Sequence, residues 1–185
     1  MNSYQGYLLI ASPKLLDPNF HRSVVLIVEH NAEGALGLIL NRPIDTTIDM
    51  VWDQVSDTPC FSGDTLNQGG PCEGTLMVLH GDMSLSERQI VQGVYFSTDK
   101  ESVEQLVGSD EDDRPVRFFV GYAGWAPDQL EAELESESWL TLPATAEHVF
   151  EPHENMWENL HHRISLTAVY PWLKPQFIPD DPSVN

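Results

Sequence analysis

The chain contains few positively charged residues. Nine Lys and Arg face 29 Asp and Glu, which gives a formal net charge of −20 over 185 residues. The nine cations are scattered singly along the chain: Lys14, Arg22, Arg42, Arg88, Lys100, Arg114, Arg117, Arg163 and Lys174. A surface this negative repels a phosphate backbone and an anionic lipid surface. We therefore predict no direct contact with nucleic acid or with a membrane.

Cysteine and long apolar runs are also scarce. Cys60 and Cys72 are the only cysteines, and their spacing matches no common zinc or redox motif, which is typical of reduced thiols in a reducing compartment. The amino terminus shows no basic segment followed by an apolar one. The apolar runs are too short to span a bilayer. These features predict a cytoplasmic protein.

Several catalytic and cofactor motifs are missing. The sequence has no G-x-S-x-G, no G-x-x-x-x-G-K and no G-x-G-x-x-G, which excludes the usual serine nucleophile elbow, phosphate loop and dinucleotide fingerprint. No cofactor is predicted. His153 and His161 share a helical face and Glu158 precedes His162 by four residues, but two ligands on an exposed helix are typical of adventitious metal binding. No functional metal site is predicted.

The apolar pattern indicates a mixed fold. Val24–Glu29 and Ala35–Leu40 are nearly continuous apolar runs joined by His30–Gly34, which predicts an antiparallel hairpin. Strands that are apolar on both faces are covered on both, so this hairpin belongs at the centre of a sheet. We predict a single α+β domain over residues 1–170, with a central, largely antiparallel sheet and helices packed against it, followed by a proline-rich tail over 171–185.

Local signals place the other elements. Thr98 with Glu101 forms a capping box that predicts the start of a helix. Cys60–Asn67 has little periodicity and is predicted to be a loop, while His148–Phe150 is predicted to be a last strand. A helix from about Glu154 to Arg163 is predicted from its apolar spacing.

One group of residues combines glycine-rich turns with a scarce cation. Its members are Glu29, His30, Asn41, Arg42, Gly69, Gly70 and His80. In a functional interpretation, Arg42 and the backbone amides of Gly69-Gly70 bind an anion in a cleft, with His80 nearby. In a structural interpretation, the polar side chains satisfy turn backbones, the glycines permit positive φ, and Arg42 pairs with a carboxylate. Because His30 and Asn41 lie at opposite ends of the hairpin, a pocket that contains both requires a bend or another chain.

Trp125 ends the segment Gly121-Tyr122-Ala123-Gly124-Trp125. Its ring is a candidate to stack on a planar ligand, because the glycines allow close approach, or to anchor the helix that follows. Both interpretations remain open.

Several blocks together resemble a known family. Residues 6–43 read GYLLIASPKLLDPNFHRSVVLIVEHNAEGALGLILNRP and resemble the opening of the YqgE/AlgH family. Further blocks follow in the same order: Gly69-Gly70-Pro71, Leu79-His80, Tyr95-Phe96-Ser97, Gly121–Trp125, Gln129-Leu130-Glu131 and Glu133-Leu134. The resemblance implies a compact bacterial α+β fold without a settled biochemical activity, in which some members are labelled putative transcriptional regulators for a role in alginate production. Cys72 departs from the pattern, where an aliphatic residue is usual, and the proline-rich end has no counterpart.

These observations favour a non-enzymatic cytoplasmic binding or regulatory protein that acts through an unknown protein or small-molecule partner. Two alternatives stay open. One is a transcriptional regulator that acts indirectly or on DNA, which the resemblance implies and for which the sequence shows no helix-turn-helix or basic element. The other is an enzyme of unrecognised type that uses His80, His30 or Cys72.

Overall fold

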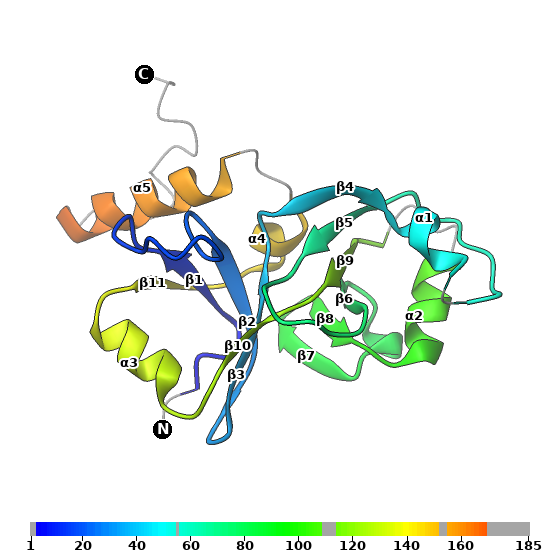
Figure 1. Cartoon of the computed structure of the whole chain (residues 1–185), viewed down its shortest axis with the longest axis horizontal. Coiled ribbons are helices and arrows are strands. Elements are labelled where there is room, and N and C mark those ends of the chain that lie inside the picture. The colour runs from blue at the N-terminus through cyan, green and yellow to red at the C-terminus, as the bar shows by residue number, and fades with distance from the viewer. Residues whose placement is uncertain (1–2, 55, 109–113, 152–154, 170–185) are drawn as a thin grey trace.

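Two β-sheets form the centre of the molecule. The computed structural model describes residues 3–54, 56–108, 114–151 and 155–169, and the predicted tail over 171–185 lies outside them (Figure 1). The structure is an α+β fold with mainly antiparallel sheets, as predicted from the sequence. No helix within the described ranges is long and apolar enough to cross a membrane.

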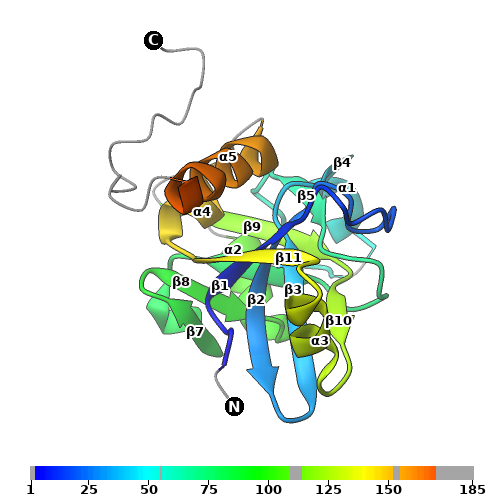
Figure 2. The same ribbon diagram turned by 90° about the vertical axis from the view of Figure 1, so that its left-hand side faces the viewer.

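Sheet A is antiparallel throughout and has the predicted hairpin in it. Its strands, in spatial order, are β10 (Ala123–Trp125), β3 (Gly34–Ile39), β2 (Val24–Asn31), β1 (Tyr7–Ala11) and β11 (Trp139–Pro143). Figure 2 shows β1, β2 and β3 side by side. The middle strand, β2, is buried from Val24 to Val28, as expected for a strand with both faces covered.

Sheet B is a mixed sheet of six strands. They are, in spatial order, β4 (Pro43–Thr47), β5 (Thr65–Gln68), β9 (Val116–Val120), β6 (Met77–His80), β8 (Val94–Ser97) and β7 (Arg88–Val91). Only β5 and β9 pair in parallel among the described strands. Neighbouring residues of β9 point to opposite faces, so that Phe118 and Phe119 enter two different apolar clusters.

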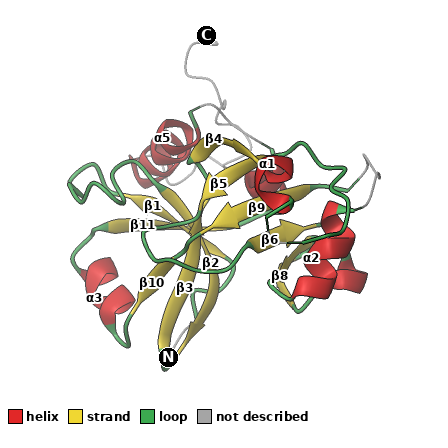
Figure 3. Ribbon diagram, turned by 45° about the vertical axis from the view of Figure 1, so that its right-hand side comes forward, coloured by secondary structure: helices red, strands yellow, loops and turns green. Residues whose placement is uncertain are grey.

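Helices cover the outer faces of the two sheets (Figures 1 and 3). On the side of sheet B lie α1 (Ile48–Trp52) and α2 (Lys100–Val107), which bury the second apolar cluster. On the side of sheet A lie α3 (Gln129–Glu135) and α5 (Met156–Val169), with α4 (Ala146–Phe150) between the sheets' ends. A short 3-10 helix, η1, spans Met83–Leu85. The larger cluster fills the space between the sheets and under α5, which contributes Met156, Trp157 and Leu160.

Three local expectations were wrong. Residues 148–150 belong to α4 and not to a strand, because Thr145 and His148 form a capping box. The helix expected after Thr98 is capped by Asp99, whose carboxylate accepts from the Ser102 amide, while the Thr98 hydroxyl contacts Glu87. The expected loop before Asn67 contains β5, whose pairing partners come from distant segments.

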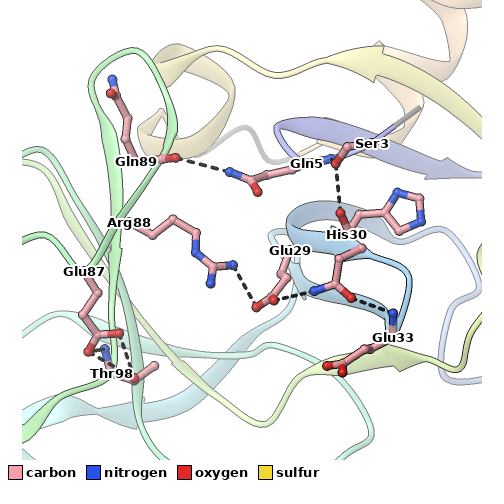
Figure 4. A network of polar contacts seen from close by, with 10 residues as sticks. Ser3, Gln5, Glu29, His30, Glu33, Glu87, Arg88, Gln89 and Thr98 are labelled. Atoms are coloured by element: carbon pink, nitrogen blue, oxygen red, sulfur yellow. Dashed lines mark hydrogen bonds and ion pairs between the residues drawn. The ribbon is translucent and has the colours of Figure 1, made fainter. Parts of the chain in front are cut away.

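A polar network ties the two sheets together at the far end of β2 (Figure 4). The register of β2 shifts between Ile27 and Glu29, which is a β-bulge that redirects the side chains beyond it. Glu29 forms a 2.8 Å ion pair with Arg88 of β7, and Gln5 donates to the carbonyl of Gln89. Arg88 is thereby committed to a contact between the sheets.

Candidate functional site

The residues singled out by sequence do not form one site. His30 lies at the far end of β2, whereas Asn41 and Arg42 follow β3 at the opposite end of the hairpin, as the antiparallel pairing requires. His80 ends β6 in the other sheet. Within the described part of the chain, no hydrogen bond joins His30, His80 and Cys72.

His30 is a buried structural histidine. Its Nδ1 accepts from the Tyr4 amide at 3.0 Å, which leaves the proton of the neutral ring on Nε2. Nε2 donates to Glu131 at 3.1 Å. The imidazole thereby ties the amino-terminal segment and α3 to β2.

His80 is fully buried beside Ser97. The Ser97 hydroxyl donates to the Leu85 carbonyl at 2.6 Å, so its oxygen accepts from His80 Nε2 at 3.0 Å. Nδ1 of His80 has no hydrogen-bond partner among the described residues. Burial lowers the pKa of His80, opposed by Asp82, which favours a neutral ring. The pair resembles a Ser-His dyad in type, but both residues are closed off from solvent.

Gly69 and Gly70 allow two backbones to cross. A Cβ on Gly69 would lie 2.3 Å from the carbonyl oxygen of Gly121, and one on Gly70 would lie 2.1 Å from the carbonyl carbon of Tyr122. The Gly69 amide donates to the Val120 carbonyl at 2.9 Å. These contacts explain both glycines as close-packing positions.

Trp125 anchors α3 through a carboxylate. Its Nε1 donates to Glu133 Oε2 at 2.9 Å, and Nε1 of Trp139 donates to the same oxygen at 2.8 Å. Phe20 packs against both indole rings. The contact joins two of the sequence blocks described above, the one that ends at Trp125 and the one that begins at Glu133.

Asn41 shapes the loop that precedes β2. Its Oδ1 accepts from the Val24 amide at 2.9 Å and its Nδ2 donates to the Arg22 carbonyl at 2.9 Å. Arg42 donates to the His21 carbonyl, and burial lowers the pKa of its guanidinium against the opposing effect of Asp17. Arg22 itself has φ 54, a left-handed conformation that is strained for a residue with a side chain.

A cleft of about 780 Å³ opens beside this loop, where β4, β5 and β9 meet α4 and α5. These elements lie together in the upper part of Figure 1. The lining residues are Arg22, Leu40, Asn41, Pro43, Asp64, Thr65, Asn67, Val116, Arg117, Phe150, Glu151, Met156, Trp157 and Glu158. Of the residues proposed from sequence, Asn41 alone is among them. The volume is in the range of small-molecule sites.

Arg117 lies at the floor of the cleft. Its guanidinium donates to the Leu40 carbonyl and to Asn67 Oδ1, each at 2.6 Å, and to the Val149 carbonyl at 2.9 Å. It also lies over the ring of Phe119, 5.3 Å from the centroid. All three acceptors are neutral, and Arg117 forms no ion pair with a carboxylate in the described ranges.

Burial lowers the pKa of Arg117 to about 10. The side chain therefore stays charged at neutral pH. Neutral acceptors replace part of its hydration, and the described residues supply no opposite charge to it. Three of the five guanidinium N–H groups have acceptors among the described residues. Among the described residues, the other two N–H groups have no acceptor and the charge has no carboxylate partner.

Sequence reasoning missed Arg117 and Asn67. Arg117 was counted only among the scattered cations, although a charged residue within the apolar strand Val116–Val120 was a usable signal. Asn67 was placed in a loop, while the structure buries it in β5 opposite Phe119. The described residues contain no group of three or more His, Cys, Asp or Glu that could hold a metal ion, and His153 lies outside them.

Comparison with known proteins places the chain in a family. A family model described as AlgH-like matches residues 8–168. A UPF0301 protein of Chlorobaculum tepidum is 42% identical over 160 residues, covering 82% of each chain. A UPF0301 protein of Photobacterium profundum is 37% identical, covering 87% of this chain and 91% of its own.

Solved structures share the fold. The solution structure of AlgH from Pseudomonas aeruginosa has a TM-score of 0.68 at 28% identity, covering 94% of this chain and 93% of its own. A crystal structure of a Corynebacterium diphtheriae protein has a TM-score of 0.67 at 24% identity, covering 88% of both chains. The chain belongs to the YqgE/AlgH family.

Proposed function

We propose that this protein is a non-enzymatic cytoplasmic binding protein that takes a small anionic molecule into the Arg117 cleft. The observation that carries the proposal is the buried Arg117 guanidinium in the cleft, which has no carboxylate partner among the residues that the structure describes. In a chain with 29 acidic residues, a buried cation has many candidate partners, and yet all its described acceptors are neutral.

The energetics favour an incoming anion. A desolvated charge without an opposite charge nearby is energetically unfavourable. An anion that supplies the opposite charge is therefore bound favourably. A carboxylate or phosphate in contact with Arg117 gains charge-assisted hydrogen bonds of about 1.5–3 kcal/mol each. Because Leu40, Asn67 and Val149 already hold the guanidinium in place, little side-chain entropy is lost on binding.

The same geometry speaks against a long polyanion. Asp64, Glu151 and Glu158 also line the cleft, and they repel an extended phosphate backbone. Arg88 and Arg114 are engaged elsewhere, in ion pairs with Glu29 and Asp82. The proposal therefore favours a small ligand over nucleic acid.

NMR spectra of the amide and guanidinium groups test this proposal directly. Sodium phosphate and sodium acetate are titrated separately at constant ionic strength while the Arg117 Nε–H and the Asn67 side-chain amide are followed. Saturable shifts at both groups are expected with at least one anion. At a hundredfold excess over Kd, binding also adds about 2.7 kcal/mol to the free energy of unfolding.

Two variants define the control. Arg117→Met abolishes the saturable shifts, whereas Arg88→Gln, which removes an arginine outside the cleft, leaves them unchanged. If Arg117→Met does not fold, Arg117→Lys replaces it, because an ammonium group cannot reproduce the bidentate guanidinium contact and should weaken the anion-dependent shifts at Asn67. Shifts that are absent from the parent protein, or that persist unchanged at Asn67 in the Arg117 variant, contradict the proposal.

A further inference from the structure

Charge in the cleft is separated by depth. Arg117 and the buried Asn67 form the floor. Asp64 and Glu151 are exposed, and the Glu158 side chain is 48% exposed, so the carboxylates lie at the rim. The lining places Arg117 below, and three carboxylates with the exposed Arg22 above it.

The carboxylates at the rim are only partly neutralised. Glu158 faces Arg22 at 3.4 Å, which is a long and exposed pair. Asp64 accepts from the Ser62 hydroxyl at 2.6 Å, a neutral donor. Neither Asp64 nor Glu151 forms an ion pair within the described residues. The rim therefore retains negative charge that a simple anion meets on its way to the floor.

Apolar side chains also line the cleft. Trp157, Phe150 and Val116 belong to the lining, and Trp157 and Met156 are buried. A ligand in the cleft contacts this apolar part of the lining. Such a ligand gains from having carbon atoms between its charged ends.

We propose that the cleft binds a small zwitterion, with its carboxylate or phosphate on Arg117 and its ammonium group among Asp64, Glu151 and Glu158. The inference rests on the proposed function, and it adds the ammonium group and its position. A zwitterion satisfies both charged levels, whereas a monoanion is attracted by one and repelled by the other.

The experiment compares matched ligands. Phosphoethanolamine and β-alanine are zwitterions, inorganic phosphate and acetate are anions, and ethylamine is a cation. Each is titrated at constant ionic strength while Arg117 and Asn67 are followed by NMR. The zwitterions are expected to bind tighter than the matching anions by about two- to fivefold for each carboxylate engaged. Comparing phosphoethanolamine with phosphate tests a phosphate as the anionic group, and comparing β-alanine with acetate tests a carboxylate.

Substitutions at the rim should change the affinity for zwitterions differently from the affinity for simple anions. Asp64→Asn with Glu151→Gln should weaken the zwitterions by about two- to fivefold per substitution and leave the simple anions unchanged or tighter. Both positions are exposed, so the variant is expected to fold. Glu135→Gln, on α3 outside the cleft, is the control and should change neither affinity.

The outcomes separate the two proposals. Zwitterions that bind no tighter than the anions, or that gain affinity in the rim variant as the anions do, overturn the inference and leave the proposed function standing. If neither anions nor zwitterions shift Arg117, the proposed function fails and the inference fails with it.

Discussion

Removing the Glu133 carboxylate tests how the tryptophans of sheet A are held. Glu133 Oε2 accepts from the indoles of Trp125 and Trp139, and Oε1 accepts from the Gln129 side chain at 2.9 Å. Both indoles are at least 95% buried, so Glu133→Ala leaves two buried donors without their acceptor. At about 1–3 kcal/mol for each of the two unsatisfied donors, we expect a loss of about 2–6 kcal/mol. That is a large part of a typical free energy of unfolding of about 5–15 kcal/mol.

Urea unfolding followed by tryptophan fluorescence gives the free energies. Glu133→Gln keeps one oxygen that can accept from both indoles and loses the charge and the exposed bond from Gln129, so its loss should be smaller than that of Glu133→Ala. Glu135→Ala, on the same helix, should change stability by less than about 0.5 kcal/mol. A loss below about 1 kcal/mol for Glu133→Ala, or equal losses for the two Glu133 variants, would refute the role of the carboxylate as acceptor.

Two further predictions concern Gly70 and His80. Gly70→Ala places a Cβ 2.1 Å from the carbonyl carbon of Tyr122 and should lower the free energy of unfolding by at least about 3 kcal/mol, measured by urea unfolding. Gly63→Ala, with no atom within 4 Å of the new Cβ, is the matched control and should be within about 0.5 kcal/mol of the parent. For His80, burial lowers the folded pKa below its ordinary value of 6.5, so the unfolded chain takes up the proton first. Stability should therefore fall as pH drops below about 6.5, by at most about 1.4 kcal/mol per pH unit, until the folded pKa is passed. His80→Gln should flatten this dependence, and an unchanged pH profile would show that His80 is not its source.

Local patterns were sufficient for much of the fold. The length and continuity of two apolar runs, with the short connector between them, predicted β2 and β3. The apolar spacing of Met156, Trp157 and Leu160 predicted the buried face of α5. In each of these elements, the defining residues are close in sequence.

The cleft could not be predicted in the same way. The acceptors of Arg117 lie 77, 50 and 32 residues away, and two of them are backbone carbonyls, which any residue provides. The identity of these residues therefore does not indicate that they meet at Arg117. Gly69 and Gly70 left two interpretations open in the sequence, because the need for close backbone contact and the need for an anion nest select the same residue.

The position of Arg117 links occupancy of the cleft to the motions of the whole molecule. One guanidinium holds the end of β3 through Leu40, β5 through Asn67 and α4 through Val149. Opening the two sheets at this edge breaks the Leu40 contact, whereas Arg117 and Asn67 stay together on neighbouring strands of sheet B. We therefore expect a ligand on Arg117 to slow amide hydrogen exchange at the junction of the two sheets, so that exchange rates report its presence.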